Sequence, residues 1–292
     1  MPCLALEEDK VTEPKVSLPI IFEGSPLPTN KHHVSYSELV EWIQCSWRHK
    51  LHHIDKIDLD KPSEHTEFGG IIHDAIEQFL VSKEPLNSEE TGKKVVEALG
   101  KLPEFKEDSS VWAEAVKPIF EELPGFLDLN FPGWSLVSAE HELMESIEKK
   151  QNRYFKGFID CVLKYDFVDK RKKDPVVEER FAVIDWKSTG YGWSNDKKRD
   201  PVKQMQLVLY KHFWATKTNT PPEKIKCAWV LLKREAKPGE HIEFVPVSVG
   251  ETATENAMAN IYRMIGSVEK KIFTKNRNSC RFCPYLSTEH CT

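Results

Sequence analysis

The 292-residue sequence lacks any long hydrophobic run. No apolar stretch is long enough to span a bilayer, and the N-terminal MPCLALEEDK lacks the basic and then apolar pattern of a secretion signal. An excess of positive charge is also missing, because the formal net charge is -5. We therefore expect an intracellular, cytoplasmic protein with no membrane partner. A net negative charge does not exclude a polyanionic ligand, because acidic metal sites lower the net charge while local basic patches remain.

The sequence contains an odd number of cysteines. Seven cysteines without a secretion signal argue against a disulfide framework and leave ligation of a metal or a cluster as the alternative. Three of them form a C-x2-C-x7-C tail: Cys280, Cys283 and Cys291. Such a tail could be half of a zinc site. The remaining cysteines apart from Cys45 follow no ligand spacing, and Cys161 and Cys227 are expected as small buried side chains in strands.

Hydrophobic periodicity divides the chain into helices and strands. Helices are predicted over residues 35–54, 67–80, 199–217 and 251–271, with one or two more within 81–130. Strands are predicted over residues 134–144, 153–166, 180–187, 224–233 and 241–249. We interpret this order as a loose arm or added edge strand over residues 1–33, followed by one α/β domain over 34–292. Its mostly antiparallel mixed sheet would carry helices against it.

One strand ends in an unusual pair of charges. In RFAVIDWKSTGYGW, residues 180–193, an apolar run leads into Asp185, and Lys187 follows two positions later. Residues two apart in a strand point to the same face, so Asp185 and Lys187 should lie side by side with Trp186 facing away. By itself this pattern is more often a surface ion pair, which contributes little to stability.

A second carboxylate falls inside the preceding strand. Asp160 shares its predicted face with the apolar residues Phe158 and Val162. Burying an unpaired carboxylate is costly, and a divalent metal ion shared with Asp185 would remove that cost. Carboxylate oxygens favour Mg2+ or Mn2+. Lys187 beside this pair could hold a water or stabilise negative charge on a phosphate.

Two predicted helices carry further polar side chains at helical spacing. His73 lies one turn before Glu77, although a lone helical histidine is more often structural. Gln206 and Tyr210 lie four residues apart on one face of the helix after the Asp185 strand.

Taken in order, these elements resemble one family. His73, Gly157-x-x-Asp160, Asp185-x-Lys187 and Gln206-Leu207-x-x-Tyr210 are similar to the motifs of the PD-(D/E)XK nuclease superfamily. They resemble most its RecB-like branch, which includes CRISPR-associated adaptation nucleases and phage exonucleases. The resemblance runs from about residue 35 to the C-terminus. It implies a restriction-endonuclease-like mixed β-sheet core flanked by helices, with a helical insertion at about 81–130.

The resemblance also implies a role for each motif residue. Metal binding falls to His73, Asp160, Asp185 and the backbone carbonyl of Trp186. Lys187 would position or activate the attacking water, while Gln206 and Tyr210 would organise the site and contact the phosphate backbone. Glu140 falls where relatives often carry a site carboxylate.

The cysteines resemble those of iron–sulfur members of the same branch, in which one cysteine precedes the nuclease core and three follow it. The resemblance implies a [4Fe-4S] cluster on Cys45, Cys280, Cys283 and Cys291, joining the chain ends through a tail at about 276–292. The gap before Cys291 is longer than in relatives, and His290 precedes it. Zn2+ or no metal at all remain the alternatives.

The loop after Lys187 combines aromatic and basic residues: Tyr191, Trp193, Lys197, Lys198 and Arg199. Such residues suit stacking on unpaired bases and neutralising phosphates, although an ordinary exposed loop has the same composition. With the resemblance, they predict a metal-dependent DNA exonuclease acting on single-stranded DNA or DNA ends. The setting would be recombination, repair or spacer processing in a bacterial, archaeal or phage-infected cell. A DNA-binding module without cleavage, a zinc-stapled structural protein, an RNA substrate and a homo-oligomer stay open.

Overall fold

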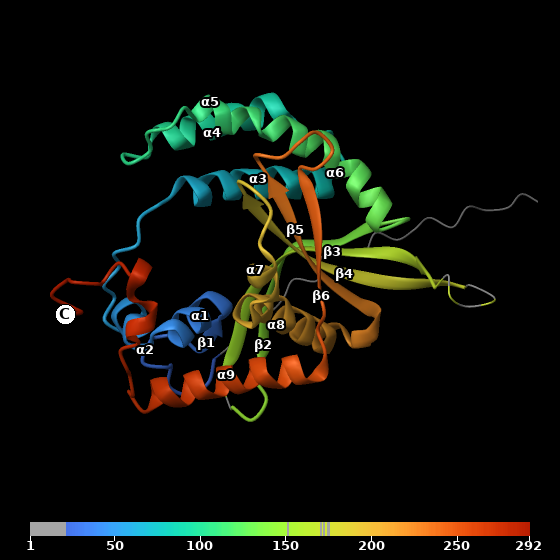
Figure 1. Ribbon diagram of the computed structural model, residues 1–292. Coiled ribbons are helices and arrows are strands. Elements are labelled where there is room, and N and C mark those ends of the chain that lie inside the picture. Colours follow the sequence, from blue (N-terminus) through green and yellow to red (C-terminus); the bar gives the residue numbers. More distant parts are fainter. Residues whose placement is uncertain (1–21, 151, 170, 172, 174–175) are drawn as a thin grey trace, which may run out of the picture.

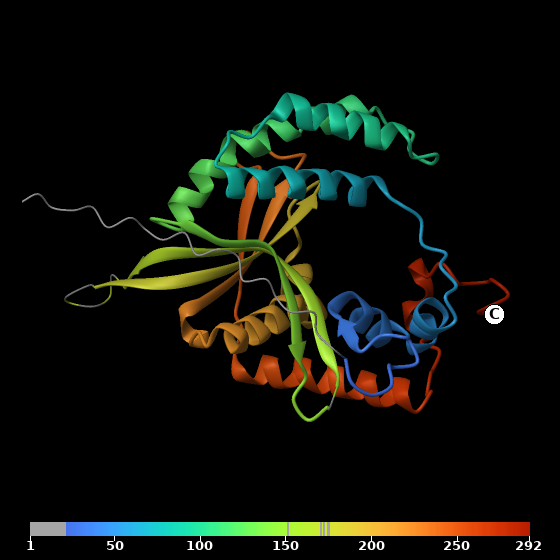
Figure 2. The same cartoon turned by 180° about the vertical axis from the view of Figure 1, so that it is seen from behind.

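The structure, a computed structural model, describes residues 22–150, 152–169, 171, 173 and 176–292. Most of the expected N-terminal arm, including Cys3, lies outside the described residues. Within them the chain forms one mixed sheet with helices on both faces (Figure 1; Figure 2 shows the view from behind). No helix in this part of the chain is long and apolar enough to cross a membrane.

The elements follow the predicted order. The strands are β1 His33–Ser35, β2 Ser135–Ser146, β3 Tyr154–Val168, β4 Val177–Thr189, β5 Ile225–Lys233 and β6 Ile242–Val247. The α-helices are α1 Tyr36–Gln44, α2 Ser46–His49, α3 Glu64–Ser82, α4 Ser88–Gly100, α5 Ser109–Glu114, α6 Val116–Asn130, α7 Asn195–Arg199, α8 Pro201–Thr218 and α9 Glu251–Glu269. A π-helical turn, Lys50–Ile54, follows α2, and short 3-10 turns occupy Pro222–Lys224 and Arg277–Phe282.

The sheet has the order β1-β3-β4-β5-β6. β1 and β4 pair with different parts of the same edge of β3, and β2 pairs with its opposite edge. β2, β3 and β4 form antiparallel neighbours, β4 and β5 run parallel, and β6 returns antiparallel to β5. The parallel pairing of β4 with β5 requires a crossover, which α8 provides. The mixed α/β fold predicted from the sequence is therefore confirmed.

Two hydrophobic cores lie on opposite faces of the sheet. The first packs α8 and α9 against residues such as Val183 and Trp229. The second packs α3 and α6 against Ile184, Trp186 and their neighbours. In Figures 1 and 2, α4 and α5 lie outside α3, while α9 lies outside α8. The central strands β3, β4 and β5, which carry Asp160, Asp185 and Lys187 or their neighbours, thus lie between two layers of helices.

The start of α8 shows how local sequence positions the motif helix. The side chain of Asp200 accepts a hydrogen bond from the Val202 amide at 2.9 Å, and Pro201 occupies the first helical position. Both features are typical helix-start signals, and the helix ends at Asn219 in the left-handed conformation. The predicted helix over 199–217 is confirmed with nearly the predicted ends.

The prediction of one helix over 35–54 is wrong. Cys45 has an extended backbone, with φ -162° and ψ 107°, and separates α1 from α2. The amide of the next-but-one residue, Trp47, donates to Thr274 O at 3.1 Å, and Thr274 N donates to Ser46 Oγ at 2.8 Å. Contacts with the C-terminal segment therefore override the local helical pattern.

The prediction for the insertion at about 81–130 also differs from the structure. It contains three helices, α4, α5 and α6, where one or two were predicted.

Candidate active site

The two motif carboxylates meet where the sheet splits. Along one edge, β3 pairs first with β1 over residues 154–156 and then with β4 from Cys161 onward. Cys161 opposite Ile184 is the last pair of the β3–β4 ladder, so Asp160 and Asp185 are the first residues beyond it. The Trp186 amide then donates to Asp160 Oδ2 at 2.8 Å. The Asp160 carboxylate of β3 thus accepts the hydrogen bond that a backbone carbonyl of a paired strand would otherwise accept from the Trp186 amide.

Asp185 is fully buried, with 0% of its surface exposed. Its Oδ2 lies 2.7 Å from Lys187 Nζ, as expected for residues on one strand face. Its Oδ1 has no hydrogen-bond partner among the described residues. Burial would lower the pKa of Lys187, but the charges of Asp185 and Asp160 outweigh burial and raise it, so the ammonium form is stable.

Asp160 joins this pair from the neighbouring strand. Its side chain is 14% exposed, and its Oδ2 lies 3.7 Å from His73 Nδ1. Burial, followed by the nearby charge of Asp185, raises the pKa of Asp160 well above its usual value. Burial also lowers the pKa of His73, so its imidazole is neutral and can act as a ligand. Of the two apolar residues expected on the same face, Val162 is buried, whereas Phe158 is 44% exposed.

Glu140 lies opposite Asp160. Ala139 pairs with Cys161 and His141 with Ile159, which places Glu140 across from Asp160 in β2. Its φ of 44° is in the left-handed region, which is costly for a residue other than glycine. Burial, and then the charges of Glu77, Asp74 and Asp185, raise the pKa of Glu140. Glu140 therefore lies in the same cluster of acidic residues as Asp185. Asp74 also belongs to this cluster, although the sequence pattern did not single it out.

The close approach of Tyr210 explains why the G-x-x-D motif has glycine at position 157. A Cβ atom at this position would lie 2.7 Å from Tyr210 Cε1. The Tyr210 ring therefore approaches the β3 backbone closely, and its hydroxyl accepts a hydrogen bond from Gln206 Nε2 at 3.3 Å. Burial, with the charges of Asp185 and Asp160 nearby, raises the pKa of Tyr210. Tyr210 thus stands near the carboxylates, and Gln206 is joined to it by this hydrogen bond.

Tyr36 is a neighbour of the site that no sequence motif indicated. Its hydroxyl donates to Val202 O at 3.1 Å, which joins α1 to the start of α8. Burial, and then the charge of Asp185, raise the pKa of Tyr36. Tyr36 therefore lies close enough to Asp185 to feel its charge, and its hydroxyl fixes the start of α8.

The donors gathered here fit a divalent metal ion. Two carboxylates, a neutral imidazole and the Trp186 carbonyl are ligand types that Mg2+ or Mn2+ can use. The buried Asp185 Oδ1 without a partner is the strongest sign, because such an atom is costly unless something pairs with it. The ligand atoms of His73, Asp160 and Asp185 do not all lie within 4.8 Å of one another, so ligation requires side-chain rotation.

Comparison with known proteins agrees with this geometry. The family model of the PD-(D/E)XK nuclease superfamily matches residues 33–288, which is most of the chain. The chain belongs to this superfamily. A solved structure from Eubacterium rectale, described as a candidate exonuclease, superposes with a TM-score of 0.52 at 12% sequence identity. The superposition covers 88% of this chain and 89% of the other, and at this identity it supports the fold alone. None of the curated proteins matches the chain.

Four cysteines of this PD-(D/E)XK protein line one small cavity between the chain ends: Cys45, Cys280, Cys283 and Cys291. The amide of Asn276 donates to Cys45 Sγ at 3.4 Å. Among the described residues, no three cysteine sulfurs lie within 4.8 Å of one another, whereas tetrahedral zinc would bring them to about 3.8 Å. The cysteines share a cavity, but their sulfur atoms are farther apart than they would be around a single zinc ion.

The other two described cysteines behave as predicted. Cys161 and Cys227 are buried in the sheet, one in each hydrophobic core. Burial raises the pKa of both thiols, that of Cys227 to about 12. Neither has the exposed, low-pKa character of a reactive cysteine.

Part of the aromatic and basic loop is occupied by contacts within the protein. Trp193 packs its edge against Trp229 with ring centroids 5.1 Å apart, and Lys197 Nζ lies 4.4 Å above the Trp193 ring. Tyr191 is 66% exposed, and although its hydroxyl bonds to Glu235, its ring is accessible for stacking.

The basic residues of the loop form the short helix α7. Lys198 makes an ion pair with Glu243 of β6, which neutralises much of its charge. Arg199 is exposed on the last turn, and no ion pair joins it to another described residue. Of the five predicted nucleic-acid contacts, Tyr191 and Arg199 are therefore the most available, and all five remain predictions.

Proposed function

We propose that this PD-(D/E)XK protein is a divalent-metal-dependent deoxyribonuclease. One observation carries the proposal: the buried Asp185 carboxylate has an unpartnered oxygen next to Asp160 at the sheet split and an ammonium group 2.7 Å away on its own strand. A binding surface for DNA has no use for two carboxylates that repel a phosphate. A site that hydrolyses phosphodiesters uses them to hold Mg2+ or Mn2+.

Each residue has a distinct task in this proposal. His73, Asp160, Asp185 and the Trp186 carbonyl would hold the ion, which when bound supplies positive charge to neutralise the scissile phosphate. Lys187 keeps its proton and orients the attacking water through a hydrogen bond. Gln206 and Tyr210 fix the Asp160 strand and present polar groups to the phosphate backbone. Glu140 adds a further carboxylate opposite Asp160.

We further propose that the enzyme is an exonuclease on single-stranded DNA or DNA ends in the cytoplasm. The E. rectale neighbour, which shares the fold, is described as a candidate exonuclease, and this description is the reason for proposing exonuclease activity here. Exposed Tyr191 at the end of β4 supports stacking on an unpaired base. Arg199 would neutralise a phosphate nearby. Recombination, repair or spacer processing is the setting that we propose for this activity.

We also propose a [4Fe-4S] cluster on the four cysteines that line the cavity between the chain ends. Their sharing of one cavity supports the proposal, since they come from positions 45 and 280–291. A four-iron cluster holds its thiolates farther apart than one zinc ion does. Metal analysis decides between them: iron and sulfide against zinc.

The test is a nuclease assay on protein purified without oxygen. End-labelled single-stranded DNA is incubated with Mn2+ or Mg2+, and Lys187→Ala is compared with wild type. We expect metal-dependent cleavage that falls at least about 100-fold in the variant, the usual effect of losing a positioned catalytic group. Lys164→Ala is the matched control, because Lys164 also lies on a strand and pairs with a carboxylate, Glu179 at 3.2 Å.

Two outcomes would contradict the proposal. If wild type leaves single-stranded DNA, duplex DNA and RNA intact while still binding DNA, the protein is a binding module of the same fold. If it cleaves only RNA, the active site stands but the DNA substrate is wrong.

A further inference from the structure

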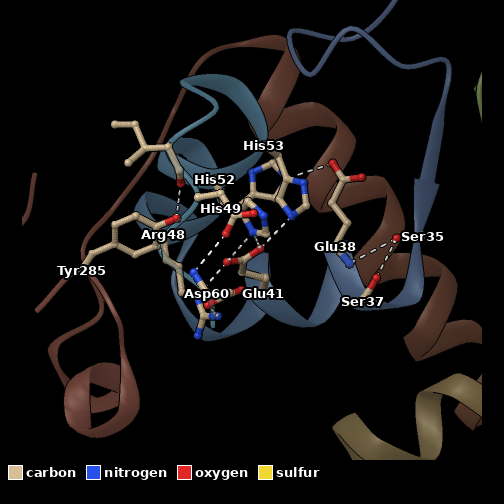
Figure 3. A network of polar contacts seen from close by, with 12 residues as sticks. Ser35, Ser37, Glu38, Glu41, Arg48, His49, His52, His53, Asp60 and Tyr285 are labelled. Carbon is tan, nitrogen blue, oxygen red and sulfur yellow. Dashed lines mark hydrogen bonds and ion pairs between the residues drawn. The ribbon is translucent and has the colours of Figure 1, made fainter. Parts of the chain in front are cut away.

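A second cluster of ligand-type side chains lies outside the nuclease site. It consists of Glu41 on α1 with His52 and His53 on the π-helical turn that follows α2 (Figure 3). One ligand atom from each of the three residues lies within 4.8 Å of the others. None of these residues belongs to the nuclease motifs or to the cysteine cavity.

The Glu41 carboxylate is the centre of this cluster. Its Oε2 lies 2.7 Å from His53 Nε2 and 3.1 Å from His52 Nδ1. Its other oxygen, Oε1, accepts a hydrogen bond from Arg48 Nε at 2.7 Å. Glu41 is buried although it is a charged residue. One oxygen is thus held by Arg48, and the other faces two imidazole nitrogens.

The π-helical turn is what brings two neighbouring histidines to one point. In a regular α-helix, consecutive side chains diverge by about 100°. Here the turn is widened, with Asp55 N donating to Lys50 O at 2.9 Å, and the His52 and His53 rings stack with centroids 4.4 Å apart. Single π-turns are frequent at functional sites because they re-aim side chains in this way.

We propose that Glu41, His52 and His53 form a binding site for one transition-metal ion of the Zn2+ class. Two imidazole nitrogens and one carboxylate oxygen are a donor set that zinc uses, whereas Mg2+ prefers oxygen alone. Bonds of 2.0–2.1 Å in a tetrahedron place donor atoms about 3.3 Å apart. The observed separations of 2.7 and 3.1 Å from Oε2 reach that value after a small outward rotation of the rings.

The surroundings of the cluster are consistent with a partly open site. His53 and His52 keep part of their surface exposed, so an ion and a water can reach them. His52 also has ligand atoms of Asp58 and Asp60 within 4.8 Å, and these carboxylates add negative charge that attracts a cation. Arg48, bound to Oε1 and close to Asp60, orients the carboxylate from the opposite side. Such an orienting partner is typical of metal-ligating carboxylates.

The alternative is a purely hydrogen-bonded network, in which neutral histidines donate to Glu41. Burial would raise the pKa of Glu41, but the hydrogen bond from His53 and the neighbouring charges lower it to about 2, so the carboxylate is ionised in either case. The two readings differ in whether the site takes up an ion, and this can be measured directly.

The experiment measures zinc bound per chain after equilibrium dialysis of the full-length protein against micromolar ZnCl2. Wild type is compared with His52→Ala/His53→Ala and with the control His65→Ala, an exposed histidine that also lies beside a glutamate, Glu64 at 3.7 Å. We expect the double variant to bind one equivalent less than wild type and the control to match wild type. Zinc held by cysteines or nuclease carboxylates is common to all three proteins and cancels in the difference.

Glu41→Gln provides a second variant that keeps the side-chain size. It should weaken zinc binding at this site at least tenfold, and zinc should raise the melting temperature of wild type more than that of the variant. Circular dichroism tests whether each variant is folded. If His52→Ala/His53→Ala is unfolded, the zinc binding of Glu41→Gln alone tests the proposal. Equal zinc stoichiometry and an equal thermal shift in folded wild type and variant would overturn the proposal. Since the readout is binding, it is independent of nuclease activity.

Discussion

At the scale of single residues, Gly157 shows how an absent side chain builds the site. Gly157→Ala would place a methyl group 2.7 Å from Tyr210 Cε1 and 3.1 Å from Phe155 Cε1. Overpacking of this kind costs about 1–3 kcal/mol. We expect a lower melting temperature and at least a tenfold loss of cleavage, because Tyr210 and the Asp160 strand are forced apart.

Gly266→Ala is the control for this prediction. Gly266 lies inside α9, and outside the backbone of that helix no atom of the described residues lies within 4 Å of the position a Cβ would take. Alanine there should stabilise the helix by up to about 1 kcal/mol. Equal melting temperatures for Gly157→Ala and wild type, measured by calorimetry, would show that Tyr210 can move aside at no cost.

The sequence was sufficient to predict the charged residues that meet at the candidate site but not everything around them. Asp185 and Lys187 follow from the two-residue period of a strand, and Asp160 from a charge within an apolar strand. The bond from the Trp186 amide to Asp160 was beyond prediction, because it depends on where two strands separate. Tyr36 and the Glu41 cluster were missed for the same reason, since their partners are distant in sequence or meet through an irregular turn.

At the scale of elements, Glu122 fastens α6 of the insertion to the turn between β5 and β6. Its carboxylate accepts hydrogen bonds from Gly239 N and His241 N, each at 2.8 Å, and lies 2.7 Å from His241 Nδ1. Burial would raise its pKa, but these hydrogen bonds outweigh burial and lower it. Glu122→Gln should cost about 1–3 kcal/mol of unfolding free energy, the usual range for hydrogen bonds to a charged group.

The pH dependence of this contact has a definite sign. A carboxyl group whose folded pKa lies below its unfolded value contributes stability above the unfolded pKa, near 4.5, and loses it as the pH falls through the folded value. Denaturant titrations should therefore show a gap between wild type and Glu122→Gln at pH 7 that narrows below about pH 4.5. Glu121→Gln, on an exposed position, should show almost no gap. A gap that stays constant down to pH 3 would be inconsistent with ionisation of Glu122.

Elements with strong local signals were predicted well, and those shaped by distant contacts were not. The strands and α8 match because apolar alternation, Asp200 and Pro201 act locally. The helix over 35–54 is broken because Cys45 and Ser46 bond to the Thr274 segment, more than 220 residues away. Nothing in the local sequence of 35–54 signals that contact.

At the scale of the whole molecule, the two ends of the nuclease domain lie against each other. The C-terminal segment lies beside α1 and α2 in Figures 1 and 2. Trp47 Nε1 donates to His290 O at 3.2 Å, Asn276 Nδ2 donates to Gln44 O at 2.8 Å, and the Tyr285 hydroxyl donates to Ile57 O. These bonds join the ends around the cavity that the four cysteines line.

If one cluster staples these ends, as we propose, its cysteines must act as a unit. Cys45→Ala and Cys283→Ala should each remove iron and sulfide and lower the melting temperature by about 3–5 °C, as a loss of about 2–3 kcal/mol would in a chain of this size. The double variant should be no less stable than either single one, because the first substitution already removes the whole staple. Cys45→Ala combined with Cys161→Ala is the control, and these effects should add, since Cys161 lies in the core beneath α3. Additive losses for Cys45 and Cys283 would mean that the two cysteines stabilise the fold separately and that no shared cluster joins the ends.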